Sequence, residues 1–127
     1  MNNREIAHEW FAMGDLDLDS AAFLLGMRPM PVEIICYHCQ QCAEKYLKGF
    51  IAFNAGEVPR THDLVALNKL CGGYDQGFAE LQERCIDLTD YGVQVRYPFH
   101  LDIEESDAKR AIENARKVRE FVVSRIN

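Results

Sequence analysis

Hydrophobic and polar residues between positions 34 and 53 recur at steps of three and four, the spacing of an amphipathic helix. One side of this helix carries mostly apolar side chains, at Ile35, Cys39, Cys42, Tyr46, Phe50 and Phe53. The other side carries Gln41, Glu44, Lys45 and Lys48, with His38 at the border between the two. These polar groups either face solvent, as on an ordinary surface helix, or point into a polar pocket between helices. The pattern alone fits both arrangements.

A first helix is expected over about residues 4–26. Its apolar face would consist of Ile6, Trp10, Met13, Ala21 and Leu24. Asp17 falls inside this apolar arc, close to the angle of Trp10. A buried carboxylate must be paired or hydrogen-bonded, so we expect Asp17 to be a structural polar residue that meets Arg96, Lys45 or a backbone donor.

Three further helices follow. Thr61 or Asp63 could cap a short helix whose apolar residues are Leu64, Leu67 and Leu70. A helix over about 78–89 would bury Phe78, Leu81, Cys85 and Leu88. Asp102, with Glu105 three residues later, resembles a capping box ahead of a last helix with the stripe Ala108, Ala111, Ala115, Val118 and Val122. The chain therefore predicts an all-α, antiparallel up-and-down bundle of four to five helices.

Composition and charge limit the class of protein. The 127 residues, 48% hydrophobic and 27% charged, suit one globular domain, residues 1–127. A net charge of −6 argues against a broad basic surface for nucleic acid, although it allows a small basic pocket. No apolar run is long enough for a membrane span, and the first residues do not resemble a signal peptide. We expect a cytoplasmic protein.

Five cysteines, an odd number, are expected to be free and buried rather than paired. The run from Cys36 through Cys39 to Cys42 has the spacing of metal ligands. On a straight helix, however, three such thiols spread over about 9 Å of rise and cannot converge on one ion. The sequence therefore predicts neither a metal nor another cofactor.

Two short segments carry candidate chemistry. The first is Thr61-His62-Asp63-Leu64, where His62 is either an exposed side chain of a capping turn or a contact for phosphate or base. The second is the segment from Arg96 to His100, in which an arginine suited to phosphate, a tyrosine suited to stacking and a histidine suited to proton transfer surround Pro98. Arg96 could equally pair with a carboxylate such as Asp17 and tie the bundle together.

These segments, taken in order, resemble the HEPN (higher eukaryotes and prokaryotes nucleotide-binding) domain family. The early Trp and Asp-Leu element of the family is similar to Trp10 with Asp17-Leu18. Its QQAxEKxLK signature matches residues 40–48, with Cys42 in place of the alanine. Its THDL element matches residues 61–64, and its RYP element matches residues 96–98.

The resemblance implies a helical bundle, often dimeric, and a frequent partnership with a small nucleotidyltransferase in toxin–antitoxin-like pairs. We therefore expect a homodimer and a nucleotide- or RNA-binding module. The residues expected to line its cleft are Gln41, Lys45, Lys48, His62, Arg96 and Tyr97.

An alternative is a metal-independent endoribonuclease with a composite site at a dimer interface, as in some family members. Arg96 would then polarise the phosphate, and His100 would act as general acid or base. This chain departs from the family's catalytic pattern, because only three residues separate Arg96 from His100 and Pro98 interrupts a regular helix there.

Overall fold

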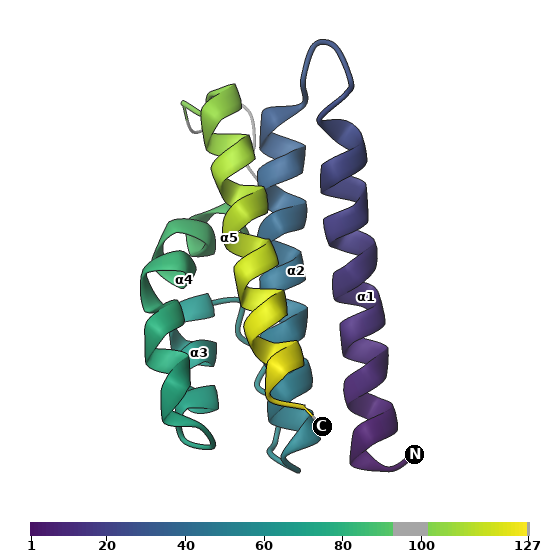
Figure 1. Ribbon diagram of the computed structural model, residues 1–127, viewed down its shortest axis with the longest axis vertical. Coiled ribbons are helices and arrows are strands. Elements are labelled where there is room, and N and C mark those ends of the chain that lie inside the picture. The colour runs from purple at the N-terminus through teal and green to yellow at the C-terminus, as the bar shows by residue number, and fades with distance from the viewer. Residues whose placement is uncertain (93–101, 127) are drawn as a thin grey trace.

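The computed structural model describes residues 1–92 and 102–126, and every regular element in these ranges is helical (Figure 1). The α-helices are α1 (Asn3–Leu24), α2 (Val32–Phe53), α3 (Leu64–Gly72), α4 (Gln82–Thr89) and α5 (Glu105–Ser124). Two short 3₁₀ helices, η1 (Gln76–Leu81) and η2 (Asp90–Gly92), precede and follow α4. The expected all-α bundle is confirmed. Within the described residues, no helix combines the length and the apolar character needed to cross a bilayer.

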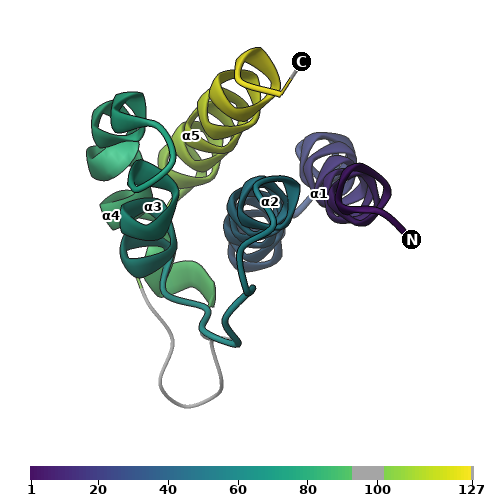
Figure 2. The same cartoon turned by 90° about the horizontal axis from the view of Figure 1, so that it is seen from below.

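Helix α2 is the central element of the bundle. Viewed along its axis, it has α1 on one side and α3 and α5 on the other (Figure 2). The expected apolar side is buried, apart from a partly buried Phe53, and Ala43, Leu47 and Ile51 are buried as well. Among the polar residues, Glu44 and Lys48 are only 4% and 5% exposed. The polar side of α2 is therefore packed inside the protein at Glu44 and Lys48, whereas Gln41, Lys45 and His38 are partly exposed.

Helix α1 packs on α2 through small residues, which corrects the apolar face expected from the sequence. Ala7, Gly14 and Ala21, seven residues apart, are buried, whereas Ile6 and Met13 are 36% and 50% exposed. A Cβ atom at Gly14 would lie 2.8 Å from Cδ2 of Tyr46. Counting large apolar residues misplaced the contact, because a close approach of two helices requires small side chains.

The two shorter helices largely bury the residues that periodicity indicated. Asp63 caps α3, and Leu64 and Leu67 are buried, but the expected core residue Leu70 is 48% exposed. The single helix expected over 78–89 begins as the 3₁₀ helix η1 and becomes α-helical at Gln82. Its expected core is confirmed, with Phe78, Leu81, Cys85 and Leu88 buried.

The last helix begins two residues later than the sequence indicated. Glu104, rather than Asp102, is its N-cap, and the capping box forms with Asp107 rather than Glu105. Aspartate and glutamate recur in this stretch, so several registers satisfy the same motif. The expected stripe is confirmed, because Ala108, Ala111, Ala115, Val118 and Val122 are all buried.

Candidate functional site

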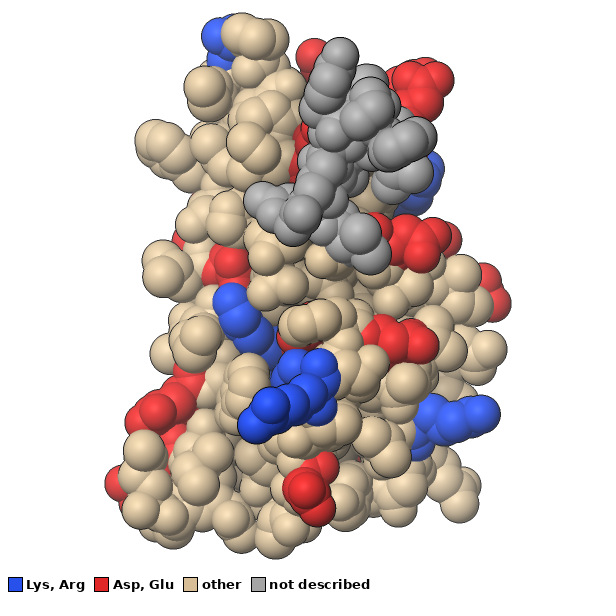
Figure 3. All heavy atoms as spheres, turned by 180° about the vertical axis from the view of Figure 1, so that it is seen from behind, with Lys and Arg blue, Asp and Glu red and all other residues tan. Residues whose placement is uncertain are grey.

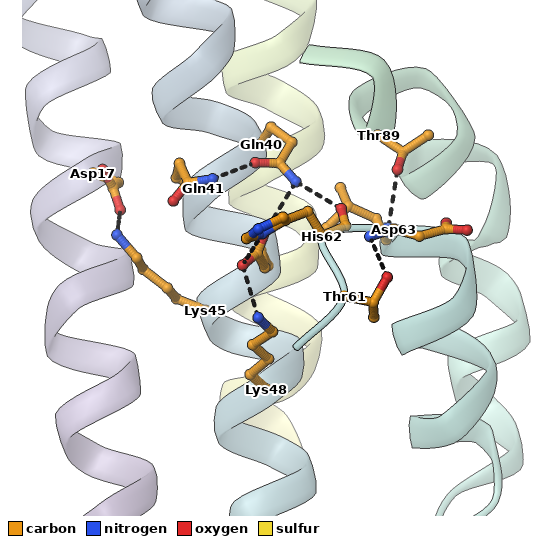
Figure 4. Close-up of polar contacts among 11 residues, drawn as sticks. Asp17, Gln40, Gln41, Lys45, Lys48, Thr61, His62, Asp63 and Thr89 are labelled. Carbon is orange, nitrogen blue, oxygen red and sulfur yellow. Dashed lines mark hydrogen bonds and ion pairs between the residues drawn. The ribbon is translucent and has the colours of Figure 1, made fainter. Parts of the chain in front are cut away.

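The Glu44 carboxylate is the centre of a polar cluster on one side of α2. Figure 4 labels its partners Gln40, Lys48 and His62. It accepts hydrogen bonds from Lys48 Nζ at 2.9 Å and from Gln40 Nε2 at 3.2 Å. These residues lie four apart along α2, so their side chains form one row on the helix surface. The third partner comes from the loop before α3, where His62 Nδ1 lies 3.0 Å from both Glu44 oxygens.

These contacts set the charge of Glu44. Burial acts to raise the pKa of its carboxyl group, but hydrogen bonds from Lys48, His62 and Gln40 outweigh burial and lower the pKa below the ordinary value. Glu44 is therefore ionised at neutral pH. A negative charge at this depth is stable only because several donors surround it.

The imidazole of His62 is held by one nitrogen and presents the other to solvent. Because Nδ1 faces a carboxylate that can only accept, Nδ1 carries a proton. The His62 carbonyl also accepts from Gln40 Nε2 at 3.1 Å, which fixes the backbone under the ring. The side chain is 70% exposed, and no described residue pairs with Nε2. Neutral His62 thus presents a proton acceptor, and protonated His62 presents a cationic donor.

The start of α3 beside His62 has little capacity left for a ligand. The Asp63 carboxylate accepts from the backbone N–H groups of Val65 and Ala66, and Thr89 Oγ1 accepts from that of Leu64. Since its first N–H groups are already paired, this helix end does not form the usual anion-binding site. The ring of His62 is therefore the exposed reactive group of this turn.

A second carboxylate, Asp17 on α1, organises the neighbouring side of α2. Asp17 is 8% exposed and lies 2.5 Å from Lys45 Nζ and 2.8 Å from His38 Nδ1. This histidine is also bound through Nδ1 to a carboxylate, but its side chain is only 28% exposed. The contacts of Asp17 with Lys45 and His38 join α1 to α2. A structural role therefore explains these residues without a ligand.

The described residues include only some of those expected to line the cleft. Lys45 and Lys48 each pair with a carboxylate, and their side chains are 17% and 7% exposed. Gln41 donates to Oε1 of Gln40 at 2.7 Å and lies at the edge of the cluster. The expected ligand and catalytic residues Arg96, Tyr97 and His100 lie outside the described residues.

The residues that the sequence interpretation left out are Gln40 and, as an acceptor, Glu44. Gln40 is fully buried and links Glu44, the His62 carbonyl and Gln41. The spacing of Gln40, Glu44 and Lys48 at four-residue intervals was the signal that could have revealed this row. Gly92, the last described residue before position 93, packs so closely on Gln40 that a Cβ atom there would meet its amide.

The cysteines take no part in this cluster. All five are free and buried, as expected from their odd number. Burial raises the pKa of Cys36 to about 11 and that of Cys42 to about 12. Such thiols remain protonated at neutral pH and behave as small core residues. In the described ranges, no group of three or more His, Cys, Asp or Glu side chains is placed to hold a metal ion.

A hollow of about 390 Å³ between α1 and α5 is a poorer candidate. It is lined by Asp15, Leu18, Asp19, Arg116, Arg119 and Glu120. Three acids stand against two arginines, and Asp15 already accepts from Arg119 Nε at 2.7 Å and from the Tyr46 hydroxyl at 2.5 Å. The hollow therefore lacks the positive charge that an anionic ligand requires.

The fold and cluster define a small helical-bundle domain with an internal charged site. Residues 7–126 match the family model of the HEPN domain. The chain therefore belongs to the HEPN domain family, which confirms the resemblance in the sequence.

Two solved structures are similar over nearly their whole length. ST0689, an archaeal HEPN homologue, is 23% identical, with a TM-score of 0.76 over 95% of this chain and 98% of its own. TT1696 from Thermus thermophilus is 25% identical, with a TM-score of 0.75 over 98% of each chain. No curated protein matches the chain.

Proposed function

We propose that this HEPN protein is a nucleotide- or RNA-binding module that works as a homodimer with a small nucleotidyltransferase, in a toxin–antitoxin-like pair. The observation that carries the proposal is the arrangement of Glu44 and His62. An exposed imidazole, oriented by an ionised carboxylate, contacts the ligand phosphate as a cationic donor when it is protonated.

The surface around His62 suits a ligand of limited size. On the face of the protein drawn in Figure 3, a small group of Lys and Arg atoms lies near the middle, with acidic atoms around it rather than a continuous basic surface. Such a distribution favours one or a few phosphates over a long polyanion. Arg96 and Tyr97 belong to the proposed site on the resemblance of the sequence alone, because both lie outside the described residues.

Calorimetry tests the binding part of the proposal. Purified protein is titrated with the four ribonucleoside triphosphates and with a short 5′-phosphorylated oligoribonucleotide. We expect His62→Gln to weaken binding by about tenfold, the loss of one charge-assisted hydrogen bond. His8→Gln, at an exposed histidine on α1, is the matched control and should bind like wild type. If wild type shows no heat of binding and no thermal shift at millimolar ligand, the binding function is refuted.

A cleavage assay distinguishes the alternative, a metal-independent endoribonuclease, from the binding module. RNA is incubated with the protein in the presence of a chelator. Cleavage that disappears in both Arg96→Ala and His100→Ala would favour the nuclease over the binding module. Cleavage that survives both substitutions would come from a contaminant.

The partner is tested by looking for a small nucleotidyltransferase gene beside this one and co-expressing its product with this protein. A complex that survives gel filtration supports the pair. Two proteins that elute separately at all concentrations would remove the partner from the proposal and leave the binding function to calorimetry.

A further inference from the structure

Helix α1 carries a row of five apolar residues, interrupted by Glu9 and Ser20, on the side that faces away from α2. The row, here called the outer seam, recurs at steps of three and four: Ile6, Glu9, Met13, Leu16, Ser20, Phe23 and, in the following turn, Met27. Its largest members are well exposed, with Phe23 at 84%, Leu16 at 68% and Met13 at 50%. Alternating steps of three and four are the heptad spacing with which helices pack side by side.

The opposite side of α1 has the same spacing and already has its partner. Ala7, Phe11, Gly14, Leu18, Ala21 and Leu25 form this inner row, which is buried or partly buried in the core. Both views place α1 at the edge of the bundle beside α2, with no described helix beyond it (Figures 1 and 2). A helix with a heptad row on each side is suited to pack on both sides. Among the described residues, α2 and α5 contact α1, and no helix covers the outer seam.

We infer that the outer seam binds the outer seam of a second copy of this chain, with the two α1 helices antiparallel. The inference deepens the homodimer part of the proposed function, on which it rests, and names its interface. A two-fold axis beside Leu16 places Leu16 against its own copy and Ile6 against Met27 of the copy. Self-complementary pairing of this kind is the rule for two-fold dimers.

The charges at the ends of α1 and the apolar area of the outer seam both fit a second copy of the chain as the partner. The antiparallel alignment that pairs Ile6 with Met27 also brings Arg28, exposed after α1, to Glu5 in the first turn of the copy, where Arg4 is the neighbouring residue. The exposed parts of the seam's apolar side chains, together with the 53% exposed Ile34 of α2, amount to roughly 700 Å² per protomer, and apolar patches this large mark interaction sites. A stable dimer buries about 800 Å² on each partner.

Sedimentation equilibrium at about 100 µM protein is the first test, because the dimer population depends on protomer concentration. We expect wild type to be a dimer, and Leu16→Glu and Phe23→Glu to weaken association by about tenfold or more. Ile86→Glu, at a 43% exposed position on α4, is the control and should remain dimeric. Circular dichroism of the variants shows whether they stay folded.

Cysteine cross-linking is the second test, and it fixes the direction of the helices. All native cysteines are buried, so a new surface cysteine reacts alone. We expect Leu16→Cys to form a covalent dimer under mild oxidation, whereas Phe23→Cys, distant from its own copy in the antiparallel arrangement, does not. Efficient cross-linking through both positions would indicate a parallel pair and overturn the proposed arrangement.

The outcomes separate this inference from the proposed function. A dimer that both glutamate variants leave intact would place the interface elsewhere and refute the seam while preserving the homodimer. A wild type that stays monomeric at every concentration would refute both the homodimer and the outer seam as its interface. The same result is expected if the seam binds only another protein. Loss of nucleotide binding in His62→Gln has no bearing on the seam.

Discussion

The Asp17 carboxylate of α1 lies 2.5 Å from the Lys45 ammonium of α2, and both side chains are mostly buried. This pair, with His38, is a charged link between the two longest helices. Asp17→Ala would leave Lys45 without its counterion in a place that water reaches poorly. We expect a loss of about 3 kcal/mol in the free energy of unfolding, as for a buried pair that loses one partner.

Urea denaturation at neutral pH measures this loss, with Asp19→Ala as the control on the same helix. Asp19 is exposed, so its removal should change stability by less than about 0.5 kcal/mol. Equal effects of the two substitutions would mean that Asp17 is not a structural residue.

Glu44 should make the stability of the protein depend on pH. Its pKa is lowered in the folded protein from an ordinary value of 4.5, so the unfolded chain takes up a proton first as the solution is acidified. The stabilisation by ionised Glu44 is therefore complete above that value and is lost as pH falls through the folded-state pKa. Glu44→Gln removes this dependence, because the amide does not titrate.

The measurement is the difference in unfolding free energy between wild type and Glu44→Gln at pH 7 and at pH 3. We expect a difference of about 3 kcal/mol at pH 7, since Lys48 loses its partner, and a clearly smaller one at pH 3. A difference that stays constant over this range would show that the Glu44 charge does not stabilise the fold.

The sequence predicted the helices well because the apolar residues of each recur with helical spacing, and α1, α2 and α5 are also long. The apolar residues expected in the core of the last two helices are buried: Ala108, Ala111, Ala115, Val118 and Val122, and Phe78, Leu81, Cys85 and Leu88. It failed at Ile6 and Met13, because periodicity identifies apolar positions on a helix without saying which of two apolar rows meets the core. The inner row of α1 is inconspicuous because its contact residues include Ala7, Gly14 and Ala21.

The site was only partly predictable for a related reason. The sequence placed Glu44 and Lys48 on one side of a helix, but both interpretations of that side, solvated or enclosed, fit the same spacing. The meeting of Glu44 with His62, eighteen residues later, depends on the path of the loop before α3. No local rule fixes that path, and only the fold reveals it.

The close contact of α1 and α2 predicts opposite effects for two glycine substitutions. A Cβ atom at Gly14 would lie 2.8 Å from the Tyr46 ring, whereas one at Gly72, the last residue of α3, would meet no atom within 4 Å. We expect Gly14→Ala to destabilise the protein by about 1–3 kcal/mol through overpacking. Gly72→Ala should leave it unchanged or raise stability by up to about 1 kcal/mol. Thermal unfolding of both variants checks this, and a harmless Gly14→Ala would mean that the helices can separate.

The end of α2 predicts a stabilising substitution. The helix ends in a turn in which Gly56 N–H donates to Ile51 O at 2.9 Å and Ala55 N–H donates to Ala52 O at 3.0 Å. This pattern is a Schellman motif, and it holds Ala55 at a φ of 63°, where a Cβ atom is strained. Glycine adopts this conformation freely, so Ala55→Gly should stabilise the protein by about 0.5–1 kcal/mol despite the added freedom of the unfolded chain.

An alanine-to-glycine substitution inside a helix should instead lower the stability of the protein. Ala12 is exposed in the middle of α1, and Ala12→Gly should destabilise the protein by about 1 kcal/mol, the ordinary effect of glycine in a helix. Chemical denaturation of the two variants side by side measures both effects against one wild type. If Ala55→Gly were as destabilising as Ala12→Gly, the left-handed residue at the end of α2 would not exist in solution. The loop that carries His62 to Glu44 would then leave α2 by a different turn.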